Sequence, residues 1–410
     1  MRILFIATGF APYTFSENIV NSKLVMAFLA KGWEVDVISK KDEGATYTTH
    51  LEEEWGVLKP LIHELSYPVG GPLVRWWDTI RSSLVMGFPL DGVRWARRAY
   101  RHALLLHDQH PYDVVLSRSP NDISHLPAYH FAKARSIPWI ANWNDPVAHL
   151  WPSPYTLPLQ GWKRRLYGYF MKRMMSYAHY NTFPSQRLGT YLLRHIPSSH
   201  TIAWRVVPHI ASPRQRPHTA EIAESFSWCH IGNLSIERSP KSLFEAISLF
   251  VRRYRGVPIR IDFMGREDEV SRSLVSYYGL EPYVRFCGSL SYHRSLEVMA
   301  RYDLLLLIEA DLKEGIFLPS KMADYSGLTR PIFAITPKGS CVAELIESYG
   351  GGICVDVSSC DAIFKGIEQL YHLWRQDRSL CSLWSEQLTE YFSEERIIEA
   401  YESMFEEVVG

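Results

Sequence analysis

The chain has 410 residues, 47% of them apolar and 13% aromatic, which excludes a disordered or collagen-like protein and predicts two or three domains with full cores. The formal net charge is zero, so bulk charge alone indicates no polyanionic partner. The charge is uneven, however, because residues 1–210 carry 23 basic and 15 acidic side chains. From Pro146 to Ala220 there is no acidic residue at all, so we expect this surface to meet something acidic.

The apolar runs and the cysteines bear on location. All six cysteines lie in the second half without a CxxC pair, which is typical of free thiols in a reducing cytoplasm. The apolar run at residues 3–7 is short and followed by Pro12, so it predicts a buried strand and not a signal peptide. No apolar run approaches the roughly 18 residues of a spanning helix, so any membrane contact is expected to be peripheral.

The first half reads as an α/β domain. Strand 3–7, helix 17–31 and strand 34–39 form a β-α-β unit, with Gly32 ending the helix. Residues 70–107 are rich in Trp and Arg and mostly helical. Further strands at 113–116 and 138–141 enclose a helix at 125–134, so a parallel sheet covered on both faces is predicted.

Residues 161–180 interleave five basic side chains with aromatic residues and methionines. On a helix this pattern predicts either an apolar stripe lying on an anionic bilayer or a core helix with a solvated basic face, and both interpretations stay open. RNA binding would also require stacking aromatics on an exposed sheet, which the sequence does not indicate, so no nucleic-acid partner is expected.

A polar, Pro-bearing segment, 211–226, is the predicted linker. A second series of strands and helices follows it and predicts a second parallel-sheet domain over 227–384. A final helical segment, 385–410, is expected to pack back onto the first domain, 1–210. The fold class is thus α/β, with two Rossmann-like parallel-sheet domains facing a central cleft where ligands of such folds bind.

Two motifs are absent and limit the chemistry. Gly9-Phe10-Ala11-Pro12 follows the first strand in place of GxGxxG, which disfavours a hydride-transfer enzyme. No Asp-x-Asp pair occurs, so neither a metal ion nor a cofactor is expected. The acidic run at 267–269 is better explained as a solvated loop.

The segment 309–336 carries the most informative residues. Pro319 stands at a predicted helix start with Ser320 and Lys321 beside it, which favours an anion. Asp324, one turn later, is placed to accept hydrogen bonds from two sugar hydroxyls. An ordinary helix start explains the same residues. A second Gly turn and helix start, with Arg238 before Pro240, predicts a cation that reaches the same diphosphate as Lys321.

These motifs and their order resemble the family-4, group 1 retaining glycosyltransferases of GT-B fold over nearly the whole chain. The segments that carry the resemblance are the opening 1–39, then 232–240, 263–265, 286–290 and 319–325, followed by Pro331. The resemblance implies a sugar nucleotide in the second domain, an acceptor in the first, and transfer with retention and without a metal. It implies that Arg238 and Lys321 hold the diphosphate and that Asp324 takes the carboxylate position at the ribose. The other donor-binding positions it implies are Gly232, Asn233, Gly265, Arg266, Gly288, Ser289, Pro319 and Ser320.

The chain departs from the family pattern at several positions. The family places a Glu eight residues before the position of Asp324, where this chain has Ile316. Either Glu314 takes that catalytic role through a shifted loop, or backbone N–H groups of 315–318 do. In the first domain Arg118 stands at a family His position. The acceptor-binding positions implied there are Glu17, Arg118, Asn121 and Asn144.

The leading hypothesis is an enzyme that moves a sugar from a UDP-, GDP- or other nucleoside-diphosphate sugar to a glycan or lipid-linked acceptor, in surface polysaccharide biosynthesis. Charge growing on the leaving diphosphate would be stabilised by Arg238 and Lys321. Asp145 is the candidate for positioning the acceptor hydroxyl, although a capped turn before Pro146 explains it nearly as well. Two alternatives stay open: a nucleotide-sugar epimerase using Glu309 and Glu314, and a non-catalytic docking scaffold.

Overall fold

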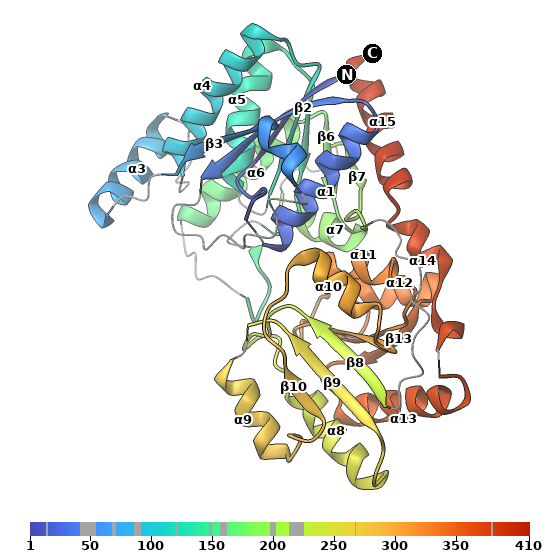
Figure 1. Cartoon of the computed structure of the whole chain (residues 1–410). Helices are drawn as coiled ribbons and strands as arrows, with labels where there is room; N and C mark the ends of the chain where they lie inside the picture. The colour runs from blue at the N-terminus through green and yellow to red at the C-terminus, as the bar shows by residue number, and fades with distance from the viewer. Residues whose placement is uncertain are drawn as a thin grey trace. The chain divides into compact units, whose positions relative to one another are not determined.

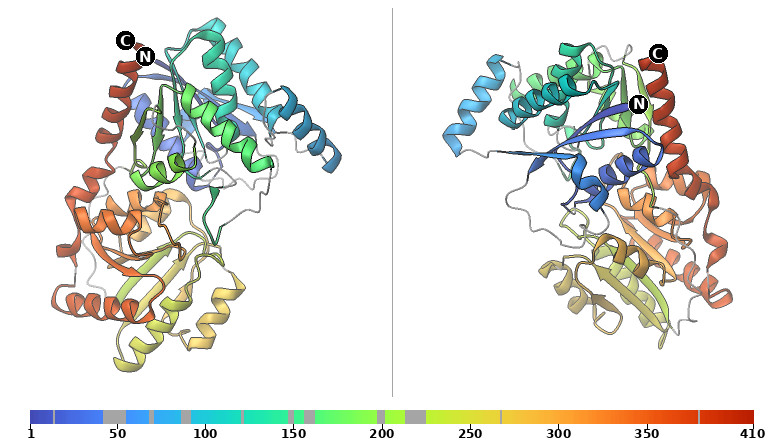
Figure 2. Two further views of the ribbon diagram at one scale, coloured as in Figure 1. Left: turned by 180° about the vertical axis from the view of Figure 1, so that it is seen from behind. Right: turned by 45° about the horizontal axis from the view of Figure 1, so that its top comes forward.

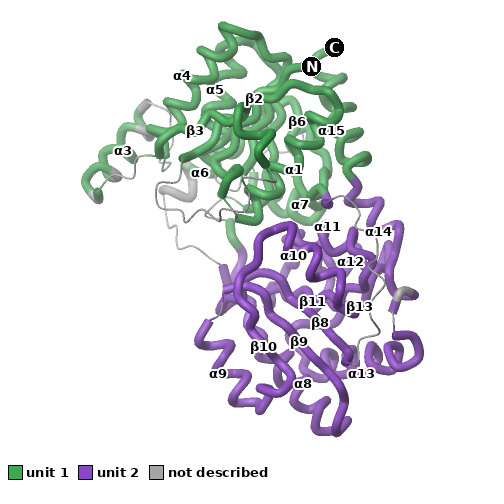
Figure 3. The backbone as a smooth tube through the Cα atoms, viewed as in Figure 1, with its two compact units in different colours: residues 1–151, 156–210, 394–410 green, residues 152–155, 211–393 purple. Residues whose placement is uncertain are grey.

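The computed structural model describes residues 1–410 except 14, 42–54, 68–70, 86–91, 120–121, 147–149, 156–161, 197–201, 213–224, 267 and 379. It divides into two compact units, drawn in different colours in Figure 3. Unit 1 comprises 1–151, 156–210 and 394–410, and unit 2 comprises 152–155 and 211–393.

Unit 1 is built on a seven-stranded sheet in the order β3-β2-β1-β4-β5-β6-β7, and all its strands are parallel. The strands are β1 (Arg2–Ala7), β2 (Glu34–Lys41), β3 (Ile62–Ser66), β4 (Val114–Arg118), β5 (Trp139–Asn142), β6 (Tyr180–Phe183) and β7 (Trp204–Val206). The central strands are apolar at successive positions because helices cover both faces of the sheet, so alternate side chains are buried on opposite sides.

Helices flank this sheet on both faces (Figure 1). They are α1 (Ser16–Ala30), α3 (Pro72–Val85), α4 (Val93–Gln109), α5 (His125–Arg135), α6 (Trp162–Tyr177), α7 (Gln186–Arg194) and α15 (Glu394–Val409). The chain also makes short 3-10 turns at Gly56–Leu61 and Asp122–Ser124. Helices α4, α5 and α6 pack side by side, while α15 packs against α1.

The last helix, α15, anchors through aromatic side chains. Tyr401 and Phe405 are buried, and Phe405 meets Trp33 edge to face at 5.3 Å between ring centroids. Phe28 contacts both Tyr401 and Phe405. The two chain termini therefore lie near each other in unit 1, as both views of Figure 2 show.

Unit 2 repeats the architecture with a six-stranded parallel sheet in the order β10-β9-β8-β11-β12-β13. Its strands are β8 (Phe226–Ile231), β9 (Ile259–Met264), β10 (Val284–Phe286), β11 (Leu304–Ile308), β12 (Ile332–Thr336) and β13 (Gly352–Asp356). Its helices are α8 (Lys241–Arg253), α9 (Glu269–Tyr278), α10 (Tyr292–Met299), α11 (Ser320–Ser326), α12 (Cys341–Tyr349), α13 (Cys360–Gln376) and α14 (Glu386–Tyr391), with a 3-10 turn at Cys381–Leu383.

Strand β11 shows how the unit 2 core is divided. Leu304 and Leu306 join the cluster packed under α8 and α13, while Leu305 and Leu307 join the cluster under α12. Successive residues of a strand point to opposite faces, so one run of apolar residues serves two cores. The predicted α/β fold class, with two parallel-sheet domains, is confirmed.

Several predicted boundaries need correction. Residue 226 is the first of strand β8, not the last of the linker. Pro152–Tyr155 group with unit 2, although they lie inside the predicted first domain. Of the predicted segment 385–410, only 394–410 group with unit 1, because α14 packs on α11 and α12 of unit 2.

The membrane interpretation of 161–180 is also wrong for the described residues of that segment. Phe170, Met171, Met174 and Met175 of α6 are buried in unit 1, so the apolar stripe is core. Tyr169 alone among the large apolar residues of 167–176 is strongly exposed. The alternative interpretation, a core helix, holds.

Replacing Phe405 by Ala is expected to lower the free energy of unfolding of unit 1 by about 3–5 kcal/mol, because removing a fully buried aromatic ring leaves a cavity. Chemical denaturation followed by circular dichroism measures the change. Val409→Ala, near the exposed end of the same helix, should stay within about 0.5 kcal/mol of wild type. Equal losses in the two variants would show that the aromatic cluster does not anchor α15.

Candidate functional site

Lys321 of α11 lies at the carboxyl edge of the unit 2 sheet. Its Nζ donates a hydrogen bond to the carbonyl oxygen of Ile231, the last residue of β8, at 2.6 Å. Burial and the charge of Arg238 lower the pKa of Lys321 to about 7, while Glu309 acts in the opposite direction. The ammonium group is thus held in a place where water stabilises it poorly and where an anion would restore its charge.

Two glycines make this close approach possible. Gly232 has φ +109°, and a Cβ there would lie 3.0 Å from the Lys321 Nζ. A Cβ at Gly265, after β9, would lie 2.4 Å from the carbonyl oxygen of Gly232. The two turns are joined further by Asn233, whose Oδ1 accepts a hydrogen bond from the backbone N–H of Arg266 at 2.7 Å. The predicted donor residues 232, 233, 265 and 266 therefore form one connected pair of turns.

Glu309 follows β11 directly and is buried. Thr336, at the end of the neighbouring strand β12, donates its hydroxyl to the Glu309 carboxylate, and Thr336 also shares a hydrogen bond with Ser340 Oγ at 2.6 Å. Burial raises the pKa of Glu309 to about 7, against the hydrogen bond from Thr336 and the charges of Arg238 and Lys321. A buried acid of this kind is a candidate for a functional group.

Arg238 precedes α8 and is exposed. Its Nε donates a hydrogen bond to the Tyr155 hydroxyl at 3.2 Å. Tyr155 also packs edge to face on Phe317 at 5.8 Å between ring centroids. Because the charge of Arg238 acts on both Lys321 and Glu309, the structure brings these three groups within electrostatic reach of one another.

His230, one residue before the end of β8, is a buried neighbour of this group. Its Nδ1 lies 3.0 Å from the carbonyl oxygen of Leu306, and since a carbonyl only accepts, Nδ1 carries the proton. Its Nε2 is buried without a hydrogen-bond partner among the residues that the structure describes. Burial and the charges of Lys321 and Arg238 hold the pKa of His230 well below its usual range. A neutral ring nitrogen is therefore left as an acceptor.

Asp324 is engaged within unit 2. Its Oδ1 accepts hydrogen bonds from the hydroxyl of Tyr292 at 2.8 Å and from the backbone N–H of Ser212 at 3.3 Å. The carboxylate therefore ties α11 to α10 and to the segment that enters unit 2. A ribose at this position would share the carboxylate with these donors.

The remaining predicted donor residues lie on the same sheet edge or on α11. Glu314 is exposed, in contrast to Glu309. Gly288 and Ser289 are exposed after β10, and Gly288 has φ +75°. Pro319 is the N-cap residue of α11, and Ser320 is its first residue.

Unit 1 contains a second polar cluster, centred on Arg118 at the end of β4. This guanidinium group is buried and donates to Asn21 Oδ1 at 2.6 Å, to the Tyr401 hydroxyl at 3.0 Å and to Asn144 Oδ1 at 3.5 Å. Helix α15 thus contributes directly to the cluster through Tyr401. Three polar partners surround a cation that water does not reach.

Glu17, in the first turn of α1, belongs to the same cluster. Asn144 donates its side-chain N–H to the Glu17 carboxylate at 2.8 Å. Burial, followed by the charge of Asp145, raises the pKa of Glu17 to about 8, against Arg118 and Asn144. The structure thereby brings together four of the residues predicted for unit 1: Glu17, Arg118, Asn144 and Asp145. Asn121 lies outside the described residues.

The sequence did not predict several residues of these clusters, and it indicated only a secondary role for one of them. Tyr155 and Tyr401 reach their partners from distant parts of the chain, and no local pattern points to them. His230 lies inside strand β8, and nothing in the local sequence marks it as a site residue. Glu309 was named only for the epimerase alternative, although its place directly after an apolar strand is a signal for the carboxyl edge of a sheet.

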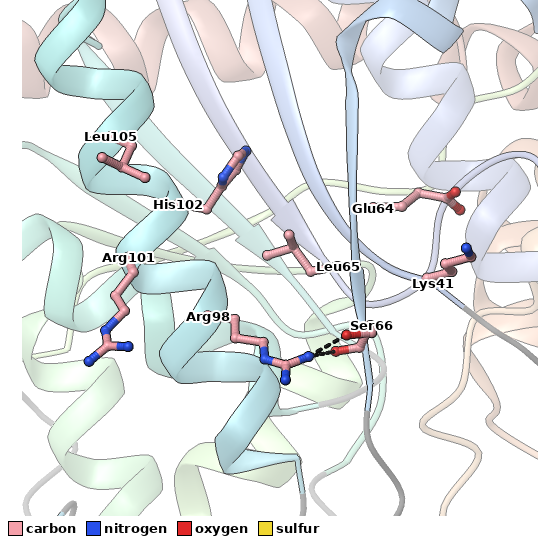
Figure 4. A pocket seen from close by; sticks show the side chains of 8 residues that line it. All are labelled: Lys41, Glu64, Leu65, Ser66, Arg98, Arg101, His102 and Leu105. Carbon is pink, nitrogen blue, oxygen red and sulfur yellow. Dashed lines mark hydrogen bonds between the residues drawn. The ribbon is translucent and has the colours of Figure 1, made fainter.

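A hollow of about 530 Å³ lies beside β3 and α4 in unit 1. Figure 4 shows Arg98 and Arg101 of α4 and Lys41 at the end of β2 among its lining residues, with Arg98 bonded to Ser66. None of these residues was predicted as a site residue. The hollow adds cationic groups to unit 1 outside the Arg118 cluster.

The chain resembles known proteins in part of its sequence and in its fold. Residues 19–208 match the family described as Glycosyl transferase 4-like domain. Unit 1 is therefore similar to a glycosyl transferase 4-like domain, and the whole chain has the GT-B fold. The expected resemblance to family-4 glycosyltransferases is thereby confirmed. No significant match occurs among curated proteins.

Solved structures similar to this chain cover almost its whole length. HepE of Anabaena in complex with UDP and glucose is 14% identical, with 99% of this chain and 100% of that one covered and a TM-score of 0.70. Sucrose-phosphate synthase from Thermosynechococcus elongatus is 14% identical, with 99% and 98% covered and a TM-score of 0.69. A protein described as a UDP-N-acetylglucosamine 2-epimerase from Listeria monocytogenes is 15% identical, with 99% and 97% covered and a TM-score of 0.59.

The lowered pKa of Lys321 predicts that nucleotide binding depends on pH. Arg238, Glu309 and His230 are the other charged or titratable groups that act on this ammonium or lie against it. Since Lys321 is protonated below about pH 7 and a diphosphate binds that form, affinity should fall as pH rises above about 7. Calorimetry at pH 8 should show proton uptake on binding of a nucleoside diphosphate.

Lys321→Arg serves as the control, because a guanidinium stays protonated and should flatten the pH profile. Lys321→Met should weaken binding by about 10- to 100-fold at pH 6, as expected for loss of one charge-assisted hydrogen bond. A wild-type affinity that stays constant from pH 6 to pH 9 would contradict this account.

Proposed function

We propose that this protein is a glycosyltransferase that transfers a sugar from a nucleoside-diphosphate sugar, UDP-linked in the first instance, to a glycan or lipid-linked acceptor, with retention at the anomeric carbon and without a metal ion. One observation carries the proposal. Arg238, Lys321 and the buried acid Glu309 act electrostatically on one another at the edge of the unit 2 sheet. HepE, which has the same fold, was solved with UDP and glucose, which supports a uridine donor.

In the proposed reaction the two cations take up the charge of the leaving group. As the bond between the anomeric carbon and the phosphate oxygen breaks, negative charge grows on the diphosphate. Arg238 and Lys321 stabilise that charge, and because Lys321 is already desolvated its contact is stronger than it would be in water. The leaving phosphate oxygen takes the proton of the acceptor hydroxyl on the same face.

Glu309 is our choice for the acid that faces the transferred sugar, in preference to Glu314. Glu309 is buried beside the two cations and held by Thr336, whereas Glu314 is exposed. A fixed carboxyl group can orient sugar hydroxyls at little entropic cost. Asp324 is proposed to contact the ribose, sharing its carboxylate with Tyr292 and Ser212. Gly288 and Ser289 stay proposed as the lining of the base pocket.

On the acceptor side, we assign Glu17 and Asp145 to the hydroxyl that attacks. The raised pKa of Glu17 means that Glu17 is mostly protonated at neutral pH, and the charge of Asp145 contributes to this. Arg118 and Asn144 hold Glu17 in place. We further propose that the reaction takes place in the cytoplasm during surface polysaccharide assembly, in line with the absence of disulfide bonds among the described cysteines.

An epimerase remains the second candidate, because a structure described as an epimerase has the same fold. The match of residues 19–208 to a glycosyl transferase domain favours transfer. The two candidates differ in their products: an epimerase changes the sugar without an acceptor, while a transferase releases nucleoside diphosphate.

The test is to incubate the protein with a panel of sugar nucleotides and follow nucleoside diphosphate release with and without acceptors. Arg238→Gln should lower kcat/KM by about 10- to 100-fold, since a charge-assisted hydrogen bond contributes about 1.5–3 kcal/mol. Lys241→Gln, an exposed cation three residues away, is the matched control and should leave turnover unchanged. A folded protein that neither binds nor hydrolyses any sugar nucleotide would refute the proposal.

Glu17→Gln should affect acceptor use without affecting donor binding. Acceptor-dependent transfer should fall by about 10- to 100-fold, as for loss of a charge-assisted hydrogen bond that positions the attacking hydroxyl. Donor binding and slow donor hydrolysis should persist, because Glu17 belongs to unit 1 and not to the Lys321 cluster. Glu34→Gln, an exposed acid of the same unit, is the control.

The pH profile gives an independent readout of the same pair. Transfer at saturating donor should rise as pH approaches about 8, because the raised pKa leaves Glu17 mostly protonated below that value. Asp145→Asn removes the neighbouring negative charge and should move the rise to lower pH. An identical profile in wild type and Asp145→Asn would show that the two acids are not coupled.

A further inference from the structure

Helix α3 exposes an unusual amount of apolar surface. Leu73, Trp76, Trp77 and Leu84 are 77%, 57%, 62% and 81% exposed. Within the described part of the chain, no other helix carries as many exposed large apolar side chains. Such clustered exposure on a water-soluble surface marks an interaction site.

These side chains form one stripe. Positions 73, 76, 77, 80 and 84 are spaced by one, three or four residues, so they fall on a single face of the helix. Asp78 lies on the other face, where its carboxylate accepts a hydrogen bond from Arg94 of α4 at 2.9 Å. The ion pair holds the polar face of α3 toward α4, and the apolar stripe lies on the opposite face of α3. Figures 1 and 2 show α3 extending outward from the unit 1 sheet.

The surroundings of the stripe are cationic. Residues 72–107 contain six Arg and two Asp, and one of those Asp residues is Asp78 in its ion pair. Arg81, Arg97 and Arg101 are exposed on α3 and α4. Arg98 and Arg101 also line the hollow beside Lys41 that Figure 4 shows. An apolar stripe on a helix that also exposes Arg81, next to a helix that exposes further arginines, is complementary to a surface that is apolar below and anionic above.

We propose that α3 docks unit 1 on a bilayer rich in anionic lipid. The helix has 14 residues, about 21 Å at 1.5 Å per residue, so it lies in the interface. None of the described helices is long and apolar enough to cross a membrane. Trp76 and Trp77 pack edge to face at 5.2 Å between ring centroids, and tryptophan partitions to the level of the lipid headgroups.

This surface replaces residues 161–180 as the membrane contact. The docking itself is independent of the transfer reaction, but its use, bringing unit 1 to a lipid-linked acceptor, rests on the proposed function. An acceptor anchored in the same bilayer would then meet the enzyme at high local concentration.

The experiment is flotation of the full-length protein with vesicles of phosphatidylcholine alone and of an equimolar mixture with phosphatidylglycerol. Wild type should float with the anionic vesicles and much less with the neutral ones. The Trp76→Ala, Trp77→Ala double variant should bind the anionic vesicles at least tenfold more weakly. The Val270→Ala, Tyr277→Ala double variant, which removes exposed apolar side chains from α9 of unit 2, should bind like wild type.

A second pair of substitutions tests the charge. Arg97→Gln together with Arg101→Gln should weaken binding to anionic vesicles by about tenfold or more and leave weak binding to neutral vesicles unchanged, since each cation near such a surface contributes about 1 kcal/mol. Arg94 is left intact so that the ion pair to Asp78 persists. Circular dichroism confirms that each variant is folded.

Three outcomes would overturn the proposal: no flotation of wild type with either vesicle, equal flotation of wild type and the tryptophan variant, or a wild-type dimer in lipid-free solution that the tryptophan variant abolishes. The last would make the stripe an interface between copies of this chain. Nucleotide release measured without lipid should be the same in wild type and the tryptophan variant. Failure of docking is thereby distinguished from failure of the proposed function.

Discussion

The desolvation of one partly buried ammonium group, that of Lys321, is the constraint on which the unit 2 site depends. Its nearest recorded partner is a single carbonyl oxygen, and Arg238 adds a second positive charge that acts on it. A buried charge with incomplete compensation destabilises the protein that holds it. The two glycine turns at 232 and 265 bring the chain close enough for this arrangement, and an anion bound there would relieve it. This edge of the unit 2 sheet is therefore more stable with an anion bound beside Lys321 than without one.

The fold was predictable because parallel strands buried on both faces appear in the sequence as short apolar runs. Leu304 to Ile308 is such a run, and every residue in it is buried on one face or the other. Glycines after strands and helices marked the turns. The end of the chain was harder to predict, since α14 and α15 are similar amphipathic helices with different partners in the two units. Helix α14 packs on α11 and α12, tens of positions earlier, whereas α15 packs on α1, hundreds of positions earlier, so the local pattern does not decide which core accepts each helix.

The same limit explains the errors at the sites. The sequence presents two amphipathic, cation-rich helices, α3 and α6, and only the fold determines that the methionines of α6 are covered while the tryptophans of α3 are not. Counting eight residues back from Asp324 reaches Ile316, and the acid nearest to that position is Glu314. Glu309 is selected instead by a contact across neighbouring strands, with Thr336 of β12. The spacing of residues in the sequence shows neither which helix face is covered nor which side chains meet across neighbouring strands.

Each unit holds an acid whose charge is suppressed, and this similarity has a functional consequence. Glu17 in unit 1 and Glu309 in unit 2 have pKa values of about 8 and about 7, both raised chiefly by burial and both opposed by a neighbouring Arg. Because each acid is held by its own sheet edge, proton binding at one does not require contacts with the other unit. On the proposed assignment, donor and acceptor recognition would be separately coupled to pH, with the working range set where Lys321 still carries its proton and Glu17 has begun to lose its own.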